Sequence, residues 1–155
     1  MAIEQNDIKK LQINLNSIRK IAGWTAQDLG KKIGVTKQTI SNLENQKTDM
    51  TLTQYIAIRT VIDYEIETNK SNEVLPQVVY LLLDIPDDEI SAEDHKKITQ
   101  AVATLAAASV GGVGLTGLIS VSAGLLGGIV GLAGIAGIGC ALGSTAWIRR
   151  LMEKE

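Results

Sequence analysis

Four polar side chains that can hydrogen-bond to another molecule lie within a single short stretch, at Lys37, Gln38, Ser41 and Asn42. If this stretch is helical, the four share its outward side, because residues three and four apart are neighbours on a helix surface. Ammonium, amide and hydroxyl groups are the types that hydrogen-bond base edges in the major groove of duplex DNA. The stretch therefore predicts a surface that reads nucleic acid.

Two short helices joined by a tight turn are expected to position that surface. The first is predicted at 26–33, with Thr25 as its N-cap and Asp28 as the capping partner. The second is predicted to begin at Thr36, another N-cap candidate, and to end near residue 45. Gly34 supplies the positive φ of the turn, and Gly30 lets the helices cross closely. The facing sides of the two helices are apolar, at Leu29, Ile33, Val35, Ile40 and Leu43.

This stretch resembles the helix-turn-helix domain of the Cro/C1-type repressors, which are also described as xenobiotic-response-element-like (XRE-like). The resemblance covers roughly residues 8–66 and is carried by RKIAGWT at 19–25 and ISNLEN at 40–45. It implies an all-α bundle in which the second helix of the motif enters the major groove of DNA.

The resemblance also implies roles for individual residues. Base contacts are expected of Lys37, Gln38 and Asn42. Base or backbone contacts are expected of Thr36, Thr39 and Ser41. Phosphate contacts are expected of Lys31, Lys32, Lys47 and Thr48. The chain departs from the family twice: Ala26 replaces a glutamine that contacts phosphate, and Gln46 replaces a frequent glycine, which suggests a different exit from the helix.

Charge is distributed unevenly along the 155 residues, although the net charge is only −2. Nine basic and three acidic residues lie in 9–59, whereas one basic and ten acidic residues lie in 60–94. The basic part coincides with the helix-turn-helix, as a phosphate-binding surface requires. We expect four parts: a helix-turn-helix domain at 1–68, an acidic helical connector at 69–100, a glycine-rich apolar hairpin at 101–148 and a charged tail at 149–155.

Further helices are predicted from the apolar spacing outside the motif. They are expected at 7–22, at 52–62 and, after a polar linker at 68–72, at 73–83. The apolar run 78–83 is expected either to pack on the helix-turn-helix or to form a dimer contact. Ser91 to Asp94 is a capping signature that opens another helix. Arg19 and Lys20 are expected on a solvated surface that suits the helix dipole, or on phosphates.

The stretch from Ile98 to Ile148 contains no charged residue and holds twelve of the fifteen glycines. A helix that spans a bilayer needs about 20 apolar residues, so two spans are predicted, near 101–120 and 123–148. Basic pairs at 96–97 and 149–150 favour the cytoplasmic side for both ends. A hairpin buried in a soluble oligomer is the alternative. A glycine zipper that lets helices approach closely is expected at Gly111, Gly114, Gly117, Gly124, Gly128, Gly131 and Gly134.

No set of residues suited to catalysis or metal binding stands out. His95 is expected to be an ordinary surface residue and Cys140 a buried apolar one. We therefore expect no enzyme, no cofactor and no metal site. The first residues lack an apolar segment, so no cleavable secretory signal is expected.

The sequence thus predicts an all-α protein: a Cro/C1-type helix-turn-helix bundle followed by a glycine-rich, transmembrane helical hairpin. The favoured function is a sequence-specific DNA-binding transcriptional regulator on the cytoplasmic face of a bacterial membrane. Its expected partners are double-stranded DNA, the lipid bilayer and further copies of the chain as a homo-oligomer. Two alternatives remain open: a Cro-like protein-interaction module on a membrane anchor, and a pore-forming, glycine-rich effector with an N-terminal regulatory domain.

Overall fold

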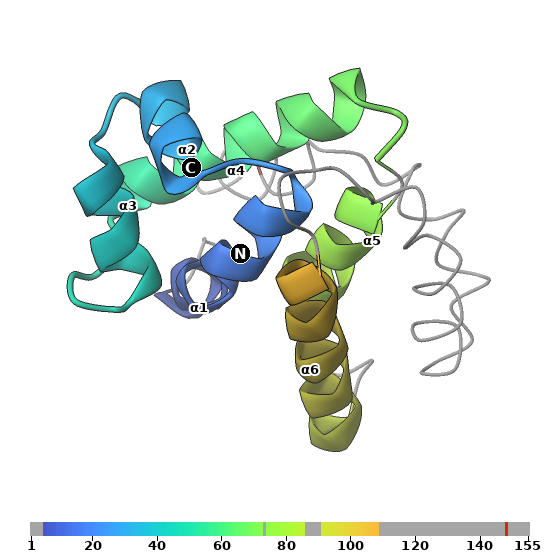
Figure 1. The fold of residues 1–155 in the computed structure, drawn as a ribbon. Coiled ribbons are helices and arrows are strands. Elements are labelled where there is room, and N and C mark those ends of the chain that lie inside the picture. The colour runs from blue at the N-terminus through green and yellow to red at the C-terminus, as the bar shows by residue number, and fades with distance from the viewer. Residues whose placement is uncertain (1–4, 73, 86–90, 109–147, 149–155) are drawn as a thin grey trace.

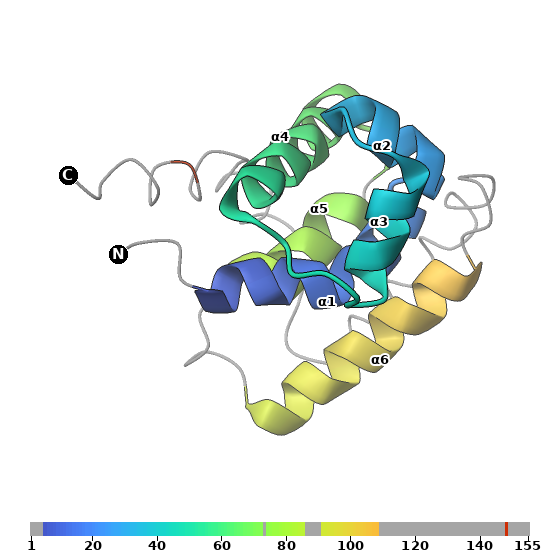
Figure 2. The same cartoon turned by 90° about the vertical axis from the view of Figure 1, so that its left-hand side faces the viewer.

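The computed structural model describes residues 5–72, 74–85, 91–108 and 148, and within these ranges the regular structure is all helical. The elements follow in the order α1 (Gln5–Ile21), α2 (Ala26–Ile33), α3 (Lys37–Glu44), α4 (Leu52–Thr68), α5 (Val74–Val79), the π-helical turn η1 (Tyr80–Asp84) and α6 (Ala92–Ala108). Figure 1 shows α2 and α3 at one end of the bundle, with α5 and α6 at the other. In the quarter-turned view of Figure 2, α3 and the loop that follows it face the viewer.

Helix α1 is the element on which both ends of the bundle pack. Its apolar residues recur at three and four positions, as the sequence predicted, and Leu11, Leu15 and Ile18 are completely buried. Helices α3 and α4 contact it from one end of the bundle, and α5, η1 and α6 contact it from the other. The helix-turn-helix and the helices that follow it therefore share one core.

Helix α4 is longer than predicted. The apolar spacing predicted an end at Ile62, whereas the helix continues to Thr68. The apolar spacing of Ile58 and Ile62 continues to Ile66 in the more polar end of the helix. Ile58 and Ile62 are buried and Ile66 packs against the same core, so the last turn stays helical. The polar linker accordingly begins at residue 69, one position after the predicted start.

The predicted helix at 73–83 is present, as α5 and η1 together. Its dense apolar run, 78–83, lies inside the molecule: Val78 and Leu81 are completely buried, and Leu82 is nearly so. Of the two roles left open for this run, packing within the chain is the one that the structure shows. The alternative, a dimer contact through this run, has little support because most of its side chains are buried within the chain.

Helix α6 crosses the domain boundary that the sequence analysis placed at 100/101. It begins as predicted, with the Asp94 backbone N–H donating to Ser91 Oγ at 3.1 Å. It then runs without a break to residue 108, and Ile98, Val102 and Ala106 are buried. Residues 101–108, expected to begin the first membrane span, therefore belong to a helix that packs on α1.

The rest of the predicted hairpin, 109–147 with all seven zipper glycines, lies outside the described residues. Among the helices that the structure does describe, none combines the length and the apolarity needed to cross a bilayer.

Two buried polar contacts join the later helices to the helix-turn-helix. The Asn72 side chain donates to the carbonyl of Ile21 at 3.0 Å and accepts from the Leu75 backbone N–H at 3.2 Å, so it links the end of α1 to the start of α5. Arg59 of α4 is buried and donates through Nη2 to both carboxylate oxygens of Asp84, at 2.9 and 3.1 Å. These contacts fix how the appended helices sit on the domain.

Removing the Asp84 carboxylate should destabilise the fold strongly, because the Arg59 charge would stay buried without this partner. We expect Asp84→Ala to lower the free energy of unfolding by up to about 3 kcal/mol. Glu93→Ala is the matched control, since Glu93 pairs with Lys97 at 3.1 Å but its side chain is 79% exposed. That variant should change the same quantity by less than about 1 kcal/mol. Urea denaturation measures both, and equal losses would contradict the expectation.

Candidate nucleic-acid interface

The start of α2 is fixed by a capping box, as predicted. The Asp28 backbone N–H donates to Thr25 Oγ1 at 3.0 Å, and the Thr25 backbone N–H donates to Asp28 Oδ2 at 2.9 Å. The pKa of Asp28 is lowered, first by the hydrogen bond from the Thr25 backbone, then by the Thr25 hydroxyl, and further by Lys31 and Lys32. A lowered pKa means that the cap is complete at neutral pH and weakens as the pH falls through that lowered value.

The turn between α2 and α3 depends on two glycines, also as predicted. Gly34 ends α2 with φ of 77°, in the left-handed region that favours glycine. A Cβ atom on Gly30 would lie only 2.7 Å from the carbonyl oxygen of Val35. The turn can therefore pass this close to α2 only with glycine at position 30.

Helix α3 presents its polar side outward. Lys37 and Gln38 are exposed and Asn42 is half-buried, whereas Ile40 and Leu43 are buried beneath them. The Gln38 side chain donates from Nε2 to Asn42 Oδ1 at 2.9 Å. We call Lys37, Gln38 and Asn42 the recognition surface.

The other polar residues predicted on or next to α3 stabilise its two ends. Thr36 is the N-cap: its Oγ1 accepts from the Thr39 backbone N–H at 3.1 Å and lies 3.0 Å from the Thr39 hydroxyl oxygen. At the other end, Asn45 donates from Nδ2 to the Ser41 carbonyl at 2.9 Å and to its hydroxyl at 3.3 Å. Thr36, Thr39 and Ser41 thus have a structural role beside the contacts predicted for them.

The end of α3 corrects the expectation of a different exit at Gln46. This residue has φ of 56°, the left-handed conformation that a glycine would adopt. The Lys47 backbone N–H donates to the Asn42 carbonyl at 2.9 Å, and the Gln46 backbone N–H donates to the Leu43 carbonyl at 3.1 Å. This pair of hydrogen bonds is the Schellman arrangement that usually has glycine at this position. The exit is therefore the glycine-type one, made by a glutamine.

The loop after α3 is held by Gln12, a residue that the sequence analysis missed. The buried Gln12 side chain donates from Nε2 to the carbonyls of Leu43, at 3.0 Å, and Thr48, at 2.7 Å. Its Oε1 accepts from the Met50 backbone N–H at 3.1 Å. The available signal was its position on the apolar side of α1, four residues after Ile8, where a polar side chain must find partners.

Glu44 holds the last turn of α3 against α1. Arg19 donates from Nε to Glu44 Oε1 at 2.5 Å and from Nη1 to the Trp24 carbonyl at 2.8 Å. Asn16 donates to the second oxygen of Glu44 at 3.1 Å. Both charged side chains are largely buried, at 11% and 8% exposure. Arg19 was expected on a solvated surface or on a phosphate, and the structure instead places it in this contact.

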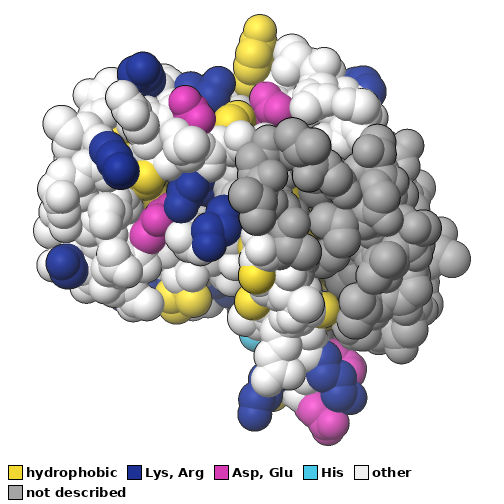
Figure 3. All heavy atoms as spheres, viewed as in Figure 1, with side chains coloured by type: hydrophobic (Ala, Val, Ile, Leu, Met, Phe, Trp, Pro, Cys, Tyr) yellow, Lys and Arg dark blue, Asp and Glu magenta, His cyan; other side chains and the backbone are white. Residues whose placement is uncertain are grey.

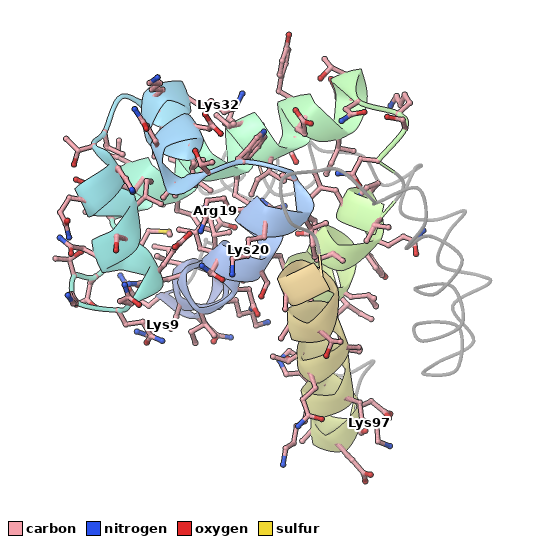
Figure 4. The ribbon with its side chains drawn as sticks, viewed as in Figure 1. Lys9, Arg19, Lys20, Lys32 and Lys97 are labelled. Atoms are coloured by element: carbon pink, nitrogen blue, oxygen red, sulfur yellow. The ribbon has the colours of Figure 1, made fainter. Side chains whose placement is uncertain are left out.

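The cations predicted to bind phosphate lie near the recognition surface in the sequence and are all exposed. Lys31 and Lys32 are in the last turn of α2, and Lys47 is in the loop after α3, followed by Thr48. Lys32 Nζ lies 5.1 Å from the centroid of the Trp24 ring, so the ring holds its charge in place. Figure 3 shows lysine and arginine side chains spread over the α2–α3 end of the molecule, and Figure 4 places Lys32 on α2.

A capped turn, a polar exposed helix and surrounding cations define a helix-turn-helix domain. Comparison of the chain with known proteins leads to the same class. Residues 15–69 match the helix-turn-helix family model. Antitoxin HipB from two strains of Escherichia coli is 46% and 44% identical over 41 residues, which cover 26% of this chain and 47% and 44% of the relatives. The chain therefore matches about half the length of these relatives. No solved structure matches it significantly. The N-terminal part of the chain is a Cro/C1-type, XRE-like helix-turn-helix domain.

Replacing Gln46 by glycine should stabilise the domain. A non-glycine residue in the left-handed region costs roughly 1–2 kcal/mol, so Gln46→Gly should raise the free energy of unfolding by about 1 kcal/mol. Gln46→Ala, which keeps a Cβ atom, should bring no comparable gain. Urea denaturation of the three proteins measures the difference, and a loss of stability in the glycine variant would contradict the assigned conformation.

Proposed function

We propose that this chain is a transcriptional regulator that binds double-stranded DNA in a sequence-specific way through α3. The observation that carries the proposal is the outward side of α3, where amide and ammonium groups are presented on a helix that is capped at its start and clamped to α1 at its end. Such a helix fits the major groove, where its first residues meet base edges. Lys37, Gln38 and Asn42 make the base contacts in this proposal.

Phosphate contacts in this proposal come from both sides of α3. Lys31 and Lys32 precede it, and Lys47 and Thr48 follow it, all exposed. Backbone contacts of this kind position a protein on the duplex without reading its sequence. Because Ala26 stands where the family usually has glutamine, the start of α2 contributes less to them. An enzyme is not proposed.

We further propose that two copies act on half-sites about one helical turn apart, because one helix-turn-helix makes few base contacts. The run 78–83 is mostly buried within the chain, so we place the dimer contact elsewhere. The word antitoxin in the relatives' name describes those proteins. A 41-residue similarity supports a shared DNA-binding module in this chain. It gives no ground for proposing a toxin partner.

The protein-interaction alternative has less support than DNA binding. A surface that docks proteins usually centres on apolar or aromatic side chains. The recognition surface consists of one lysine and two amides.

Attachment to the cytoplasmic face of a membrane is a separate hypothesis, and it rests on the sequence. It concerns 109–148, where the glycine-rich run without charged residues continues beyond α6. The first eight residues of the predicted span are committed to α6, so any crossing segment begins after residue 108. The pore-forming alternative concerns the same residues.

Lys47→Ala tests phosphate contact by the loop after α3. We expect weaker binding to every duplex, and a slope of log affinity against log salt concentration that is smaller by about 1. Lys70→Ala, an exposed lysine after α4, is the control and should leave the slope unchanged. Fluorescence anisotropy across a range of salt concentrations measures both. A wild-type protein that binds all duplexes equally would overturn the proposed function.

Cysteine accessibility tests membrane attachment. In a Cys140→Ala background, single cysteines are placed at Ser122 and Glu153, and whole cells are treated with a thiol reagent that cannot cross membranes. Because basic pairs at 96–97 and 149–150 favour the cytoplasmic side, position 122 should be labelled and position 153 spared. Labelling of position 153 from outside would contradict the hairpin topology. Recovery of the whole protein in the soluble fraction would contradict membrane attachment.

A further inference from the structure

Two side chains of the recognition surface are hydrogen-bonded to each other. Gln38 and Asn42 are four residues apart, so they are neighbours on the helix surface. Gln38 Nε2 donates to Asn42 Oδ1 at 2.9 Å. Among the residues that the structure describes, neither side chain bonds to any other group. The contact is therefore not part of the core or of a helix cap, and its effect is to orient two amides on the outward side of α3.

This hydrogen bond determines which groups each amide has left for DNA. A primary amide has one acceptor oxygen and two N–H donors. Gln38 uses one N–H on Asn42, so it keeps its oxygen and its second N–H. Asn42 turns its oxygen to Gln38, so it keeps both N–H donors of Nδ2. The pair thus presents one acceptor-and-donor group beside one donor-only group.

The two groups match different base edges in the major groove. Adenine offers a donor at N6 and an acceptor at N7, which an amide with a free oxygen and a free N–H can bind together. Guanine and thymine offer only acceptors, whereas cytosine offers only a donor. A donor-only amide therefore favours guanine or thymine and rejects cytosine. It also disfavours adenine, because the N6 donor of adenine lies beside its N7 acceptor.

We propose that Gln38 and Asn42 read neighbouring base pairs as one unit, with Gln38 selecting adenine and Asn42 selecting guanine or thymine. This inference rests on the proposed function, because it requires α3 in the major groove. Its new content is that Asn42 determines specificity at two positions: it contacts one base itself, and it fixes the orientation of the amide that contacts the other.

The test begins with selection of duplexes from a random-sequence DNA library by the full chain. Gln38→Ala should weaken binding to the selected duplex by about 10- to 100-fold. Asn42→Ala should relax selection at both positions. The double variant, with both residues replaced by alanine, should lose less affinity than two independent effects would predict. Its fold loss should be at least about threefold smaller than the product of the two single-variant losses, because the residues act together.

Asn42→Asp is the sharper variant. It keeps an oxygen for Gln38 and replaces the two donors by an acceptor. Repeated selection with this variant should change the preference at the Asn42 position to cytosine or adenine, while adenine is retained at the Gln38 position. Unchanged preferences at both positions would overturn the inference.

Controls separate a role in DNA reading from a role in folding. Gln100→Ala, an exposed glutamine on α6, should leave both affinity and selected sequence unchanged. Thermal unfolding should show the same midpoint for all Gln38 and Asn42 variants. If the wild-type chain selects no sequence, the proposed function fails. If it selects a sequence but the fold loss of affinity in the double variant equals the product of the two single-variant losses, only the paired readout fails.

Discussion

Helix α3 cannot hold itself in place, and the hydrogen bonds that α1 makes to its last turn are what the proposed interface depends on. An isolated helix of fewer than about 12 residues is marginal in water, and α3 has eight. Gln12 binds the carbonyl of Leu43 and the loop beyond it, while Arg19 holds Glu44. These groups are buried or nearly so, and a buried polar group that loses its partner costs roughly 1–3 kcal/mol. The orientation of α3 is therefore fixed by contacts from α1 on its inner side. Its outward side is left free for polar residues that add nothing to the core.

The sequence predicted the parts of this interface that local chemistry determines. Thr25 and Thr36 as N-caps and the positive φ of Gly34 are confirmed. Gly30 is needed, as predicted, for a close approach, and the backbone that approaches it is that of the turn. Each follows from the behaviour of one residue type over four or five positions. The positions of the helices along the chain were predicted from apolar spacing in the same way.

The parts that could not be predicted depend on partners far apart in the chain. Gln12 meets residues 31 and 36 positions away, and Arg19 meets Glu44 across 25 positions. A single sequence shows that such a side chain is polar, but it does not show which distant group the fold brings within hydrogen-bonding distance of it. Gln46 was misjudged for another reason: glycine is the preferred residue in the left-handed conformation, but the surrounding hydrogen bonds can impose it on glutamine.

The π-helical turn η1 places the side chains of 80–84 differently from a regular α-helix. The Ile85 backbone N–H donates to the carbonyl five residues earlier, at Tyr80, instead of four. One extra residue in the turn changes the angular position of everything after it by about 100°. Asp84 reaches Arg59 in this altered phase, while the apolar residues before it stay buried. The same residues wound as a regular α-helix would turn Asp84 away from Arg59. The width of this turn is therefore as much a part of the fold as the apolar residues within it, because the turn positions Asp84 and those residues fill the core.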